Sequence, residues 1–433
     1  MKEIYVLYGK GKLKAEIPDR NLRAILVPQK KEAENEAETV RKALKNPIGS
    51  STLAALSRNV KSICIISSDN TRPLPSKLTL PLILEELARP ALDYDITVLI
   101  ATGLHRPMTH DEIAERFGAE IMEKCRVVNH EAEDEASLAF CGKLSNGKPL
   151  YLNKQALEAD LLIAEGFIEP HFFAGFSGGR KSVLPGIAGA KTIMNNHGPA
   201  NISNPKATAG VLTGNPVHEE ALEAAKISGL KFILNVSLNE DKKIIGAFAG
   251  DMEKAHLAGC EFVKESMTVK CVPADIAVTS NSGYPLDRNV YQMVKGMDAA
   301  VSAVKPGGVI IIAGDCIDGI GSEGFKRLFQ GWSSAKEMFS AMSVGEADID
   351  QWTAQILTRI LMRNTVIVVT DKLTATEAET LFLEYAPNLK TALETAFNKM
   401  GADATVNVIP EGPAVMVSEI GCPHSFTPIC ADS

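Results

Sequence analysis

The sequence lacks the features that would place it in several large classes of protein. Basic side chains do not exceed acidic ones, since 45 Lys and Arg stand against 53 Asp and Glu for a formal charge of −8. There is no surplus of positive potential to hold a nucleic acid. No apolar run approaches the roughly 20 residues of a membrane helix, and no export signal precedes the first strand-like residues. We therefore expect a cytoplasmic protein that binds neither nucleic acid nor membrane.

The cysteines form no recognisable pattern either. They lie at positions 64, 125, 141, 260, 271, 316, 422 and 430, with no C-x-x-C pair and no spacing typical of a zinc site. Free thiols in a reducing compartment explain such a scatter. Any metal must then be held by other ligands.

What the sequence does contain is a regular alternation of strand-like and helix-like segments. Apolar strand-like runs occur at residues 62–67, 96–101, 161–164, 232–236, 276–279, 309–313 and 366–370, and helical patterns fall between them at 76–88, 216–228, 251–264, 289–304 and 350–363. Continuous apolar strands are typical of parallel sheets covered by helices on both faces. At 433 residues the chain exceeds what one core supports. We predict an α/β protein of two domains, with a boundary near residues 267–273.

The densest group of chemically useful residues lies between His171 and His197, in a glycine-rich stretch that includes Gly178-Gly179-Arg180-Lys181. Glycine lets backbone N–H groups approach a bound group closely, so this loop is a candidate anion nest. Glycine richness alone also fits a tight surface loop. The presence of His171, Lys181 and His197 in one stretch favours a functional site.

The same stretch contains a G-x-S-x-G pattern centred on Ser177, which in serine hydrolases places the nucleophile between a strand and a helix. Here the expected strand ends at Ala164, well before Ser177. The match is therefore one of sequence only and lacks the strand that the motif requires.

Polar and basic residues follow two of the expected strands directly. Asp69, Thr71 and Arg72 follow the strand at 62–67, and His105 follows the strand at 96–101. Ligands bind at the carboxyl ends of parallel strands, and a guanidinium there suits a carboxylate or phosphate. Capping of a following helix explains Asp69 and Thr71 equally well, but it does not explain Arg72.

In the second half, Tyr291 and Lys295 are four residues apart on a predicted helix, with Gln292 beside them. Residues at this spacing share one face. They form either part of a binding site or an ordinary exposed face.

Together these motifs resemble the lactate racemase family, whose members use a nickel-pincer nucleotide. The motifs are Ser68-Asp69-Asn70-Thr71-Arg72-Pro73, Gly103-Leu104-His105-Arg106-Pro107, residues 171–197, and Tyr291-Gln292-x-x-Lys295-Gly296. They cover nearly the whole chain, and four motifs in order are far more specific than one. The resemblance implies a cofactor-binding and catalytic domain of residues 1–268 with the tail 409–433, a substrate-binding domain of residues 269–408, and an active site in the cleft between them.

The resemblance also implies the cofactor and its ligands. Lys181 would be joined through a thioamide to nickel pyridinium-3-thioamide-5-thiocarboxylic acid mononucleotide, and His197 would complete the nickel coordination. Imidazole suits Ni(II), which accepts a square-planar arrangement. Asp69, Thr71, Gly178 and Gly179 are expected beside this cofactor, and enzymes of cofactor maturation are expected partners.

The activity implied by the resemblance is racemisation or epimerisation of a 2-hydroxy acid, by hydride transfer from C2 to the cofactor. His105 and His171 match the family's acid–base pair, and histidine suits this role because its pKa lies near neutral pH. Arg72, Gln292 and Lys295 would hold the substrate carboxylate, with Tyr291 in support. Phe173 and Trp352 are candidates for the side-chain pocket.

Two other functions remain open on the residues alone. One is a serine- or lysine-nucleophile enzyme that uses the glycine-rich loop. The other is a non-catalytic partner that binds the nucleotide without turnover.

Overall fold

The computed structural model describes residues 1–29, 31–87, 94–345 and 347–420. The chain divides into two compact units, each made of separate stretches. Unit 1 comprises Met1–Gln29, His197–Ala209 and Ser266–Ser433, and unit 2 comprises Lys30–Asn196 and Gly210–Glu265. Among the described residues, none of the helices combines the length and the apolar character needed to cross a membrane.

Unit 2 is built on a central sheet whose strands, within the described residues, run in the order β13-β12-β9-β4-β5-β6. The strands are β4 (Ser62–Ser68), β5 (Asp95–Ala101), β6 (Arg126–Asn129), β9 (Leu161–Phe167), β12 (Phe232–Leu238) and β13 (Ile244–Gly250). Only the pairing of β13 with β12 is antiparallel among these. Two small hairpins accompany the sheet, formed by β7 (Leu138–Lys143) with β8 (Pro149–Asn153) and by β10 (Pro170–His171) with β11 (Gly175–Phe176).

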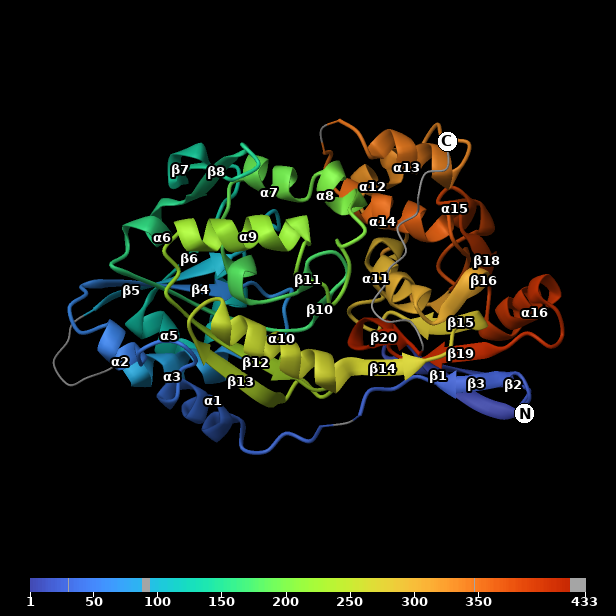
Figure 1. Cartoon of the computed structure of the whole chain (residues 1–433), viewed down its shortest axis with the longest axis horizontal. Coiled ribbons are helices and arrows are strands. Elements are labelled where there is room, and N and C mark those ends of the chain that lie inside the picture. Colours follow the sequence, from blue (N-terminus) through green and yellow to red (C-terminus); the bar gives the residue numbers. More distant parts are fainter. Residues whose placement is uncertain (30, 88–93, 346, 421–433) are drawn as a thin grey trace. The chain divides into compact units, whose positions relative to one another are not determined.

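Helices cover both faces of this sheet, as the left part of Figure 1 shows. One face packs against α1 (Glu36–Lys45), α2 (Leu53–Leu56), α3 (Ser76–Leu87), α4 (His110–Phe117) and α5 (Ala119–Lys124). The other packs against α6 (Lys154–Glu158), α7 (Ala190–Asn196), α9 (Pro216–Ile227) and α10 (Lys254–Met267). Burial on both faces explains why β9 and β12 are buried along their whole length.

Unit 1 contains a second, parallel sheet, with the order β18-β17-β16-β15-β19-β3 in its described part. The strands are β3 (Leu22–Ile25), β15 (Ala274–Ser280), β16 (Val304–Ala313), β17 (Thr365–Val369), β18 (Glu384–Ala386) and β19 (Val406–Ile409). A separate parallel pair joins β14 (Thr268–Cys271) to β20 (Met416–Glu419), seen side by side in Figure 1. The helices are α8 (Pro199–Ser203), α11 (Val290–Val301), α12 (Glu323–Leu328), α13 (Ala335–Met342), α14 (Gln351–Leu361), α15 (Ala375–Glu379) and α16 (Leu389–Met400).

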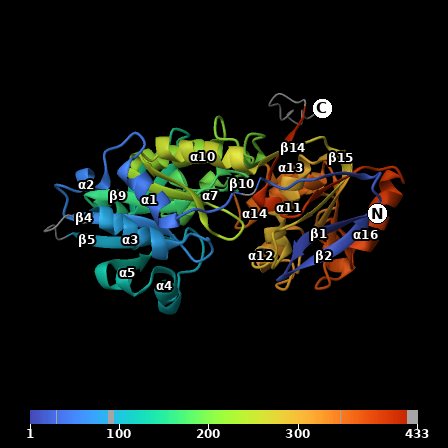
Figure 2. The ribbon, with the colours of Figure 1, turned by 90° about the horizontal axis from the view of Figure 1, so that it is seen from below.

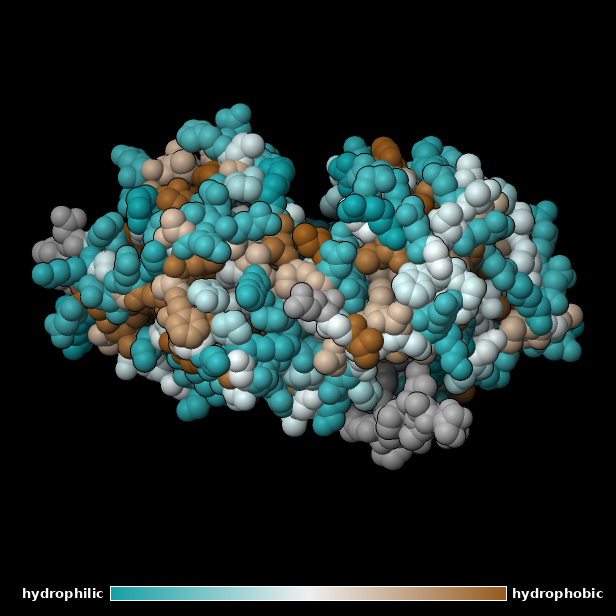
Figure 3. Space-filling view, turned by 90° about the horizontal axis from the view of Figure 1, so that it is seen from above, coloured by the Kyte–Doolittle hydropathy of each residue, from teal (hydrophilic) through white to brown (hydrophobic). Residues whose placement is uncertain are grey.

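The core of this sheet is closed on one face by α16 and by the hairpin of β1 (Lys2–Tyr8) and β2 (Gly11–Ile17), which lie next to each other in Figure 2. Side chains on β1 point alternately to its two faces, so Ile4 and Val6 are buried against the sheet while their neighbours face outward. The other face carries α11, against which α14 packs. On the surface drawn in Figure 3, hydrophobic residues are scattered among hydrophilic ones, as expected of a chain with 23% charged residues.

The predicted α/β architecture is confirmed, and each predicted strand has its counterpart in β4, β5, β9, β12, β15, β16 or β17. The compact units group the chain differently from the domains 1–268 with 409–433 and 269–408, which stay a prediction. Residues 1–29 cluster with unit 1 because β3 extends its sheet by pairing with β19. The described part of the tail also belongs to unit 1, because β20 pairs with β14. Residue 88, the expected end of a helix, and residues 421–433, with Cys422 and Cys430, lie outside the described residues.

Candidate active site

Asp69 and His105 meet at the carboxyl ends of two neighbouring parallel strands. β4 ends at Ser68 and β5 at Ala101, so the residues that follow them emerge at the same edge of the sheet. Oδ2 of Asp69 lies 2.6 Å from Nδ1 of His105. Asp69 is buried, whereas the His105 side chain is 47% exposed. The carboxylate therefore fixes a ring whose other nitrogen, Nε2, is available to a ligand.

The other oxygen of Asp69 organises the loop. Oδ1 accepts hydrogen bonds from the backbone N–H of Thr71 at 3.1 Å and from its hydroxyl at 2.5 Å. Burial raises the pKa of Asp69, but the bond and charge of His105, the Thr71 hydroxyl and the Arg72 charge outweigh it and hold the pKa below its usual value. Asp69 is thus an ionised acceptor at neutral pH. No helix begins at this loop, so helix capping is not its role.

Arg72 lies beside this pair and is half-buried. Its guanidinium donates to Thr71 Oγ1 at 2.9 Å, and its carbonyl oxygen accepts from Arg116 at 3.1 Å. By contrast, Arg106 is committed to Glu112 at the start of α4, at 2.5 and 2.8 Å. Arg72 is consequently the arginine here whose fork suits a small anion.

His171 lies on the short hairpin of β10 and β11, opposite Gly175. Its Nδ1 accepts from the backbone N–H of Ala174 at 3.3 Å and of Phe173 at 3.5 Å. A neutral ring held in this way carries its proton on Nε2. The ring packs edge-on against buried Phe173, with centroids 4.6 Å apart. His105 and His171 therefore present opposite tautomers.

The turn before Lys181 is fixed by close packing and by one hydrogen bond to the buried side chain of Asn235. Gly178 and Gly179 have φ of 75° and 53°, and Asn235 Oδ1 accepts from Gly179 N–H at 2.8 Å. A Cβ on Gly178 would lie 2.7 Å from Asn235 Oδ1. The close approach of Asn235 in β12 thus requires glycine at 178, and that of His256 in α10 requires glycine at 179. The Gly179 amide of the expected anion nest is thus occupied within the protein.

Ser177 is not arranged as a nucleophile. It is buried, its hydroxyl donates to Phe167 O at 3.0 Å, and it accepts from Glu169 N–H at 2.9 Å. A hydroxyl bonded to backbone groups on both sides has no base to activate it. The serine-hydrolase reading loses its support.

Lys181 lies in a short 3₁₀ turn, η2 (Gly179–Ser182), and is half-buried. Its Nζ lies 5.6 Å from the centre of the Phe173 ring. Burial lowers the pKa of Lys181 well below its ordinary value, and the charges of Arg180 and Arg72 lower it further. Burial thus favours the neutral amine, which is the form that makes covalent bonds to acyl-type carbon.

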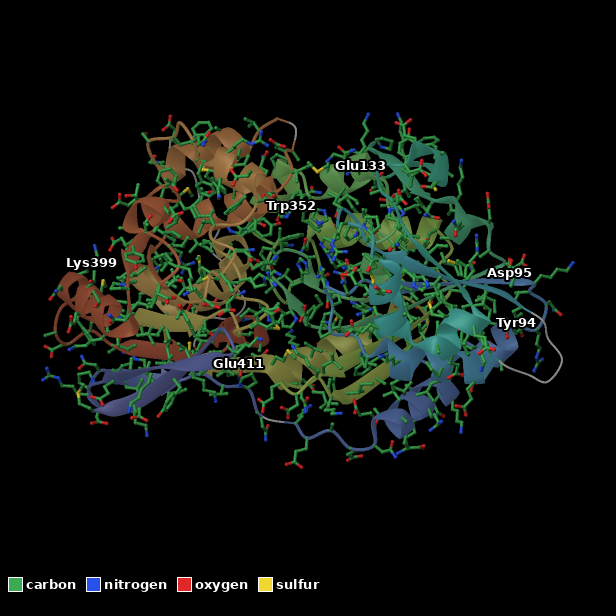
Figure 4. The ribbon with its side chains drawn as sticks, turned by 180° about the vertical axis from the view of Figure 1, so that it is seen from behind. Tyr94, Asp95, Glu133, Trp352, Lys399 and Glu411 are labelled. Atoms are coloured by element: carbon green, nitrogen blue, oxygen red, sulfur yellow. The ribbon has the colours of Figure 1, made fainter. Side chains whose placement is uncertain are left out.

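His197 belongs to unit 1, in the segment His197–Ala209. It is buried, and its ring meets Trp352 of α14 edge-on with centroids 5.5 Å apart; Trp352 is labelled in Figure 4. Gln355, one turn further along α14, holds the same segment by donating to Ser203 Oγ at 2.5 Å and Pro199 O at 3.2 Å. Helix α14 thus fixes the position of the imidazole within unit 1.

Tyr291, Gln292 and Lys295 lie on the first turns of α11 and are half-buried. The helix begins after Asn289, whose side chain accepts from Gln292 N–H at 3.0 Å. Lys295 Nζ donates to Gln292 Oε1 at 2.8 Å, which directs the Gln292 NH₂ group away from the lysine. Burial is the main cause that raises the pKa of Tyr291 to about 12, so its hydroxyl keeps its proton. The three side chains are hydrogen-bond donors on one helix.

The expected site residues thus form two groups, each defined within its own unit. Unit 2 carries Asp69, Thr71, Arg72, His105, His171, Phe173, Gly178, Gly179 and Lys181, and unit 1 carries His197, Tyr291, Gln292, Lys295 and Trp352. Within the described ranges, no three His, Cys, Asp or Glu side chains gather to hold a metal ion.

One buried residue near the site escaped the sequence analysis. Glu165 lies inside the apolar strand β9 and accepts from Ser67 and Thr79 hydroxyls, each at 2.5 Å. It is buried, and it lies close to the end of β4, because β9 and β4 are paired in parallel. A single carboxylate inside an apolar strand is the signal that would have found it, because such a charge needs dedicated partners.

Comparison with known proteins shows to which family the chain is similar. A model of the lactate racemase N-terminal domain matches residues 8–210, and one of the lactate racemase C-terminal domain matches residues 269–417. A lactate racemase of Thermoanaerobacterium thermosaccharolyticum is 47% identical over 97% of this chain and 100% of its own length. One of Lactiplantibacillus plantarum is 47% identical over 96% of this chain and 100% of its own.

Two solved structures have a similar fold. The lactate racemase apoprotein from T. thermosaccharolyticum superimposes with a TM-score of 0.93 at 47% identity, over 96% of this chain and 100% of that one. A protein from Thermotoga maritima gives a TM-score of 0.68 at 20% identity, over 90% of this chain and 100% of that one, and shows a shared fold alone.

Proposed function

Because this chain belongs to the lactate racemase family, and is therefore an isomerase, we propose that it is a racemase or epimerase of a 2-hydroxy acid. Lactate is the first substrate to test, since both relatives at 47% identity are lactate racemases. Phe173 and Trp352 are the candidate pocket residues that select the side chain of the acid.

The observation that carries this proposal is the bond between Asp69 and His105. A carboxylate 2.6 Å from Nδ1 keeps the proton on that nitrogen and leaves the Nε2 lone pair as a base. His105 accepts the hydroxyl proton of one enantiomer at Nε2. His171 is the base for the other enantiomer, on the opposite side of the reacting carbon. Its proton moves from Nε2 to Nδ1, which gives up the hydrogen bonds from the backbone N–H groups, and Nε2 then accepts the hydroxyl proton. The imidazolium formed at either histidine returns its proton in the reverse reaction.

Lys181 and His197 fit the cofactor of the family. The Lys181 amine, whose pKa burial lowers, suits a covalent thioamide link, and the buried imidazole of His197 suits nickel. His197 would be the protein's ligand to the nickel, and the nucleotide itself would supply the others. When bound, the nickel-pincer nucleotide supplies the hydride acceptor for substrate C2. Asp69, Thr71, Gly178 and Gly179 are the other residues we assign to its surroundings.

The substrate carboxylate is bound by cationic and amide donors. Arg72 offers a guanidinium next to His105, while Lys295 and Gln292 offer an ammonium and an NH₂ group held 2.8 Å apart. Such donors orient a carboxylate without taking part in proton transfer. Tyr291 stays protonated and adds a further donor.

We place the enzyme in the cytoplasm, with cofactor-maturation enzymes as partners. The cysteines in the described part of the chain are free thiols, at positions 64, 125, 141, 260, 271 and 316, which suits a reducing compartment.

The deciding experiment is production of the chain together with cofactor-synthesis enzymes. Intact mass should show a covalent addition that Lys181→Met abolishes and Lys191→Met, at an exposed lysine of α7, leaves unchanged. Elemental analysis should find nickel, and single enantiomers of lactate or related acids should lose optical rotation. An unmodified Lys181 without nickel, under conditions that load a known relative, would sink the cofactor assignment.

A further inference from the structure

Asn215 is a fully buried polar residue at the start of α9. As the N-cap of this helix, its Oδ1 accepts from the N–H groups of Val217 at 3.1 Å and His218 at 3.4 Å. Its NH₂ group donates to Phe173 O and to Val211 O, each at 3.0 Å. Capping needs only the oxygen, which Ser, Thr or Asp would also supply. The two bonds of the NH₂ group therefore call for another explanation.

The bond to Phe173 O reaches the peptide group that contacts His171. The carbonyl of Phe173 and the N–H of Ala174 belong to this one peptide, and in a trans peptide the two groups point in opposite directions. The carbonyl accepts from Asn215 at 3.0 Å, and the N–H donates to His171 Nδ1 at 3.3 Å. The peptide is thus held between the Asn215 amide and the imidazole.

The rest of this turn is fixed as well. Ala174 O accepts from the guanidinium of buried Arg180 at 2.6 Å. Gly175 has φ of 78°, and a Cβ there would lie 2.4 Å from Val211 O, the second acceptor of Asn215. The NH₂ group of Asn215 therefore joins the turn to the segment that packs directly against it.

We propose that Asn215 is a positioning residue for His171, because it holds the peptide after Phe173 with its N–H directed at Nδ1 and so keeps the ring proton on Nε2. This inference rests on the proposed acid–base role of His171. A ring nitrogen that accepts a hydrogen bond does not carry the proton. In its resting form His171 thus offers a donor to the substrate hydroxyl, whereas His105, bonded to Asp69 through Nδ1, offers an acceptor.

Two substitutions remove the NH₂ donor and retain a capping oxygen. Asn215→Asp has the same shape, and Asn215→Ser is shorter and neutral; both new residues are good N-caps. Loss of the donor is thereby separated from loss of the cap. Asn388→Asp and Asn388→Ser are the matched controls, because Asn388 is the exposed N-cap of α16 and its Oδ1 accepts from Thr391 N–H at 2.9 Å.

The position of the ring proton can be measured in apoprotein labelled with [¹⁵N]histidine. The ¹⁵N resonances of a neutral imidazole show which nitrogen carries the proton, and pH 8.5 is about two units above the ordinary histidine pKa. The chain has 8 histidines, so the signals of His171 are identified by their absence from His171→Gln. In the unmodified protein we expect the His171 proton on Nε2.

Both Asn215 variants should lower the ratio of the Nε2–H form to the Nδ1–H form of His171 by about tenfold, which is the effect of losing one hydrogen bond. The His105 signals and the two Asn388 variants should show no change. If the buried charge of Asn215→Asp prevents folding, the neutral Asn215→Ser protein decides the matter.

Three results would overturn the proposal. They are a proton on Nδ1 of His171 in the unmodified protein, an unchanged ratio in folded Asn215→Ser, and a change that appears in Asn215→Asp alone, which would be an effect of the added charge. The measurement needs no cofactor and no substrate. A failure of the loaded protein to racemise a 2-hydroxy acid would therefore refute the proposed function without deciding the role of Asn215.

Discussion

Oδ2 of buried Asp69 lies 2.6 Å from Nδ1 of partly exposed His105, although 36 residues separate them in the chain. The two strands that precede them are adjacent and parallel, so the contact follows from the topology of the sheet. It gives His105 one fixed tautomer, and several consequences can be measured.

Asp69→Asn should reduce kcat by about 10² to 10⁴, without loss of folding. An amide in place of the carboxylate can donate to Nδ1 and so favours the tautomer with the proton on Nε2, where the base is needed; the same change in a serine-protease triad has an effect of about 10⁴. Racemisation rates and thermal unfolding measured side by side would test this. Asp111→Asn, at an exposed carboxylate of α4, is the control. A variant that retains full kcat would show that the tautomer of His105 is not important.

The two histidines should act on different enantiomers. In cofactor-loaded protein, His105→Ala should stop formation of the 2-keto acid from one enantiomer in a single turnover, and His171→Ala from the other, because each removes the base on one side only. Rapid quenching with each pure enantiomer provides the measurement. His110→Ala changes an imidazole that is 83% exposed and should leave both reactions intact. Loss of both half-reactions in each single variant would exclude a division of labour.

Lys295→Met should raise KM by about 10- to 100-fold, with a smaller change in kcat. Its ammonium is held by Gln292 at 2.8 Å, and a charged hydrogen bond to a carboxylate contributes about 1.5–3 kcal/mol. Initial rates over a range of substrate concentration separate the two constants. Lys305→Met, which removes an exposed ion pair with Asp275, is the matched control. An equal increase of KM in the control would mean that Lys295 acts only through the general charge of unit 1.

Stability should depend on pH through Asp298, which pairs with Arg359 at 3.6 Å and is 12% exposed. Burial raises its pKa to about 6, although the Arg359 charge and hydrogen bond oppose this. Below the unfolded value of about 3.9, both states are protonated. As the pH rises from there through 6, the unfolded state ionises first, so folding stability falls by about 3 kcal/mol and is then constant. Asp298→Asn should lack this component, and urea unfolding at pH 4, 5, 6 and 7 compares the two proteins. Parallel pH profiles for both would disprove it.

The strands at the centres of both sheets could be predicted from the sequence because they are buried on both faces. Their continuous apolar runs at residues 62–67, 161–164 and 309–313 leave a local signal. The edge strand β3 leaves none of this kind, since its residues are half-buried or exposed and its partner β19 lies far away in the chain. Pairing between distant segments is decided by packing, which a local pattern does not record. The local sequence therefore does not show that residues 22–25 pair with residues 406–409.

The placement of Asp69, Arg72 and His105 could be predicted, because these residues follow the ends of two strands. The surroundings of a residue could not be predicted where they depend on a side chain far away in the sequence. Asn235 from β12 takes the Gly179 amide, and this altered the expected anion nest. The burial of Arg180 and the contact of His197 with Trp352 likewise depend on segments far away in the chain.

The pairing of β3 with β19 also bears on how the protein is made. The described strands of the unit 2 sheet lie between Ser62 and Gly250, so this sheet can form once the chain up to Gly250 has left the ribosome. Strand β3 is made before these strands, whereas its partner β19 is made after them. Unit 2 is thus expected to fold during translation, before β3 can pair with β19.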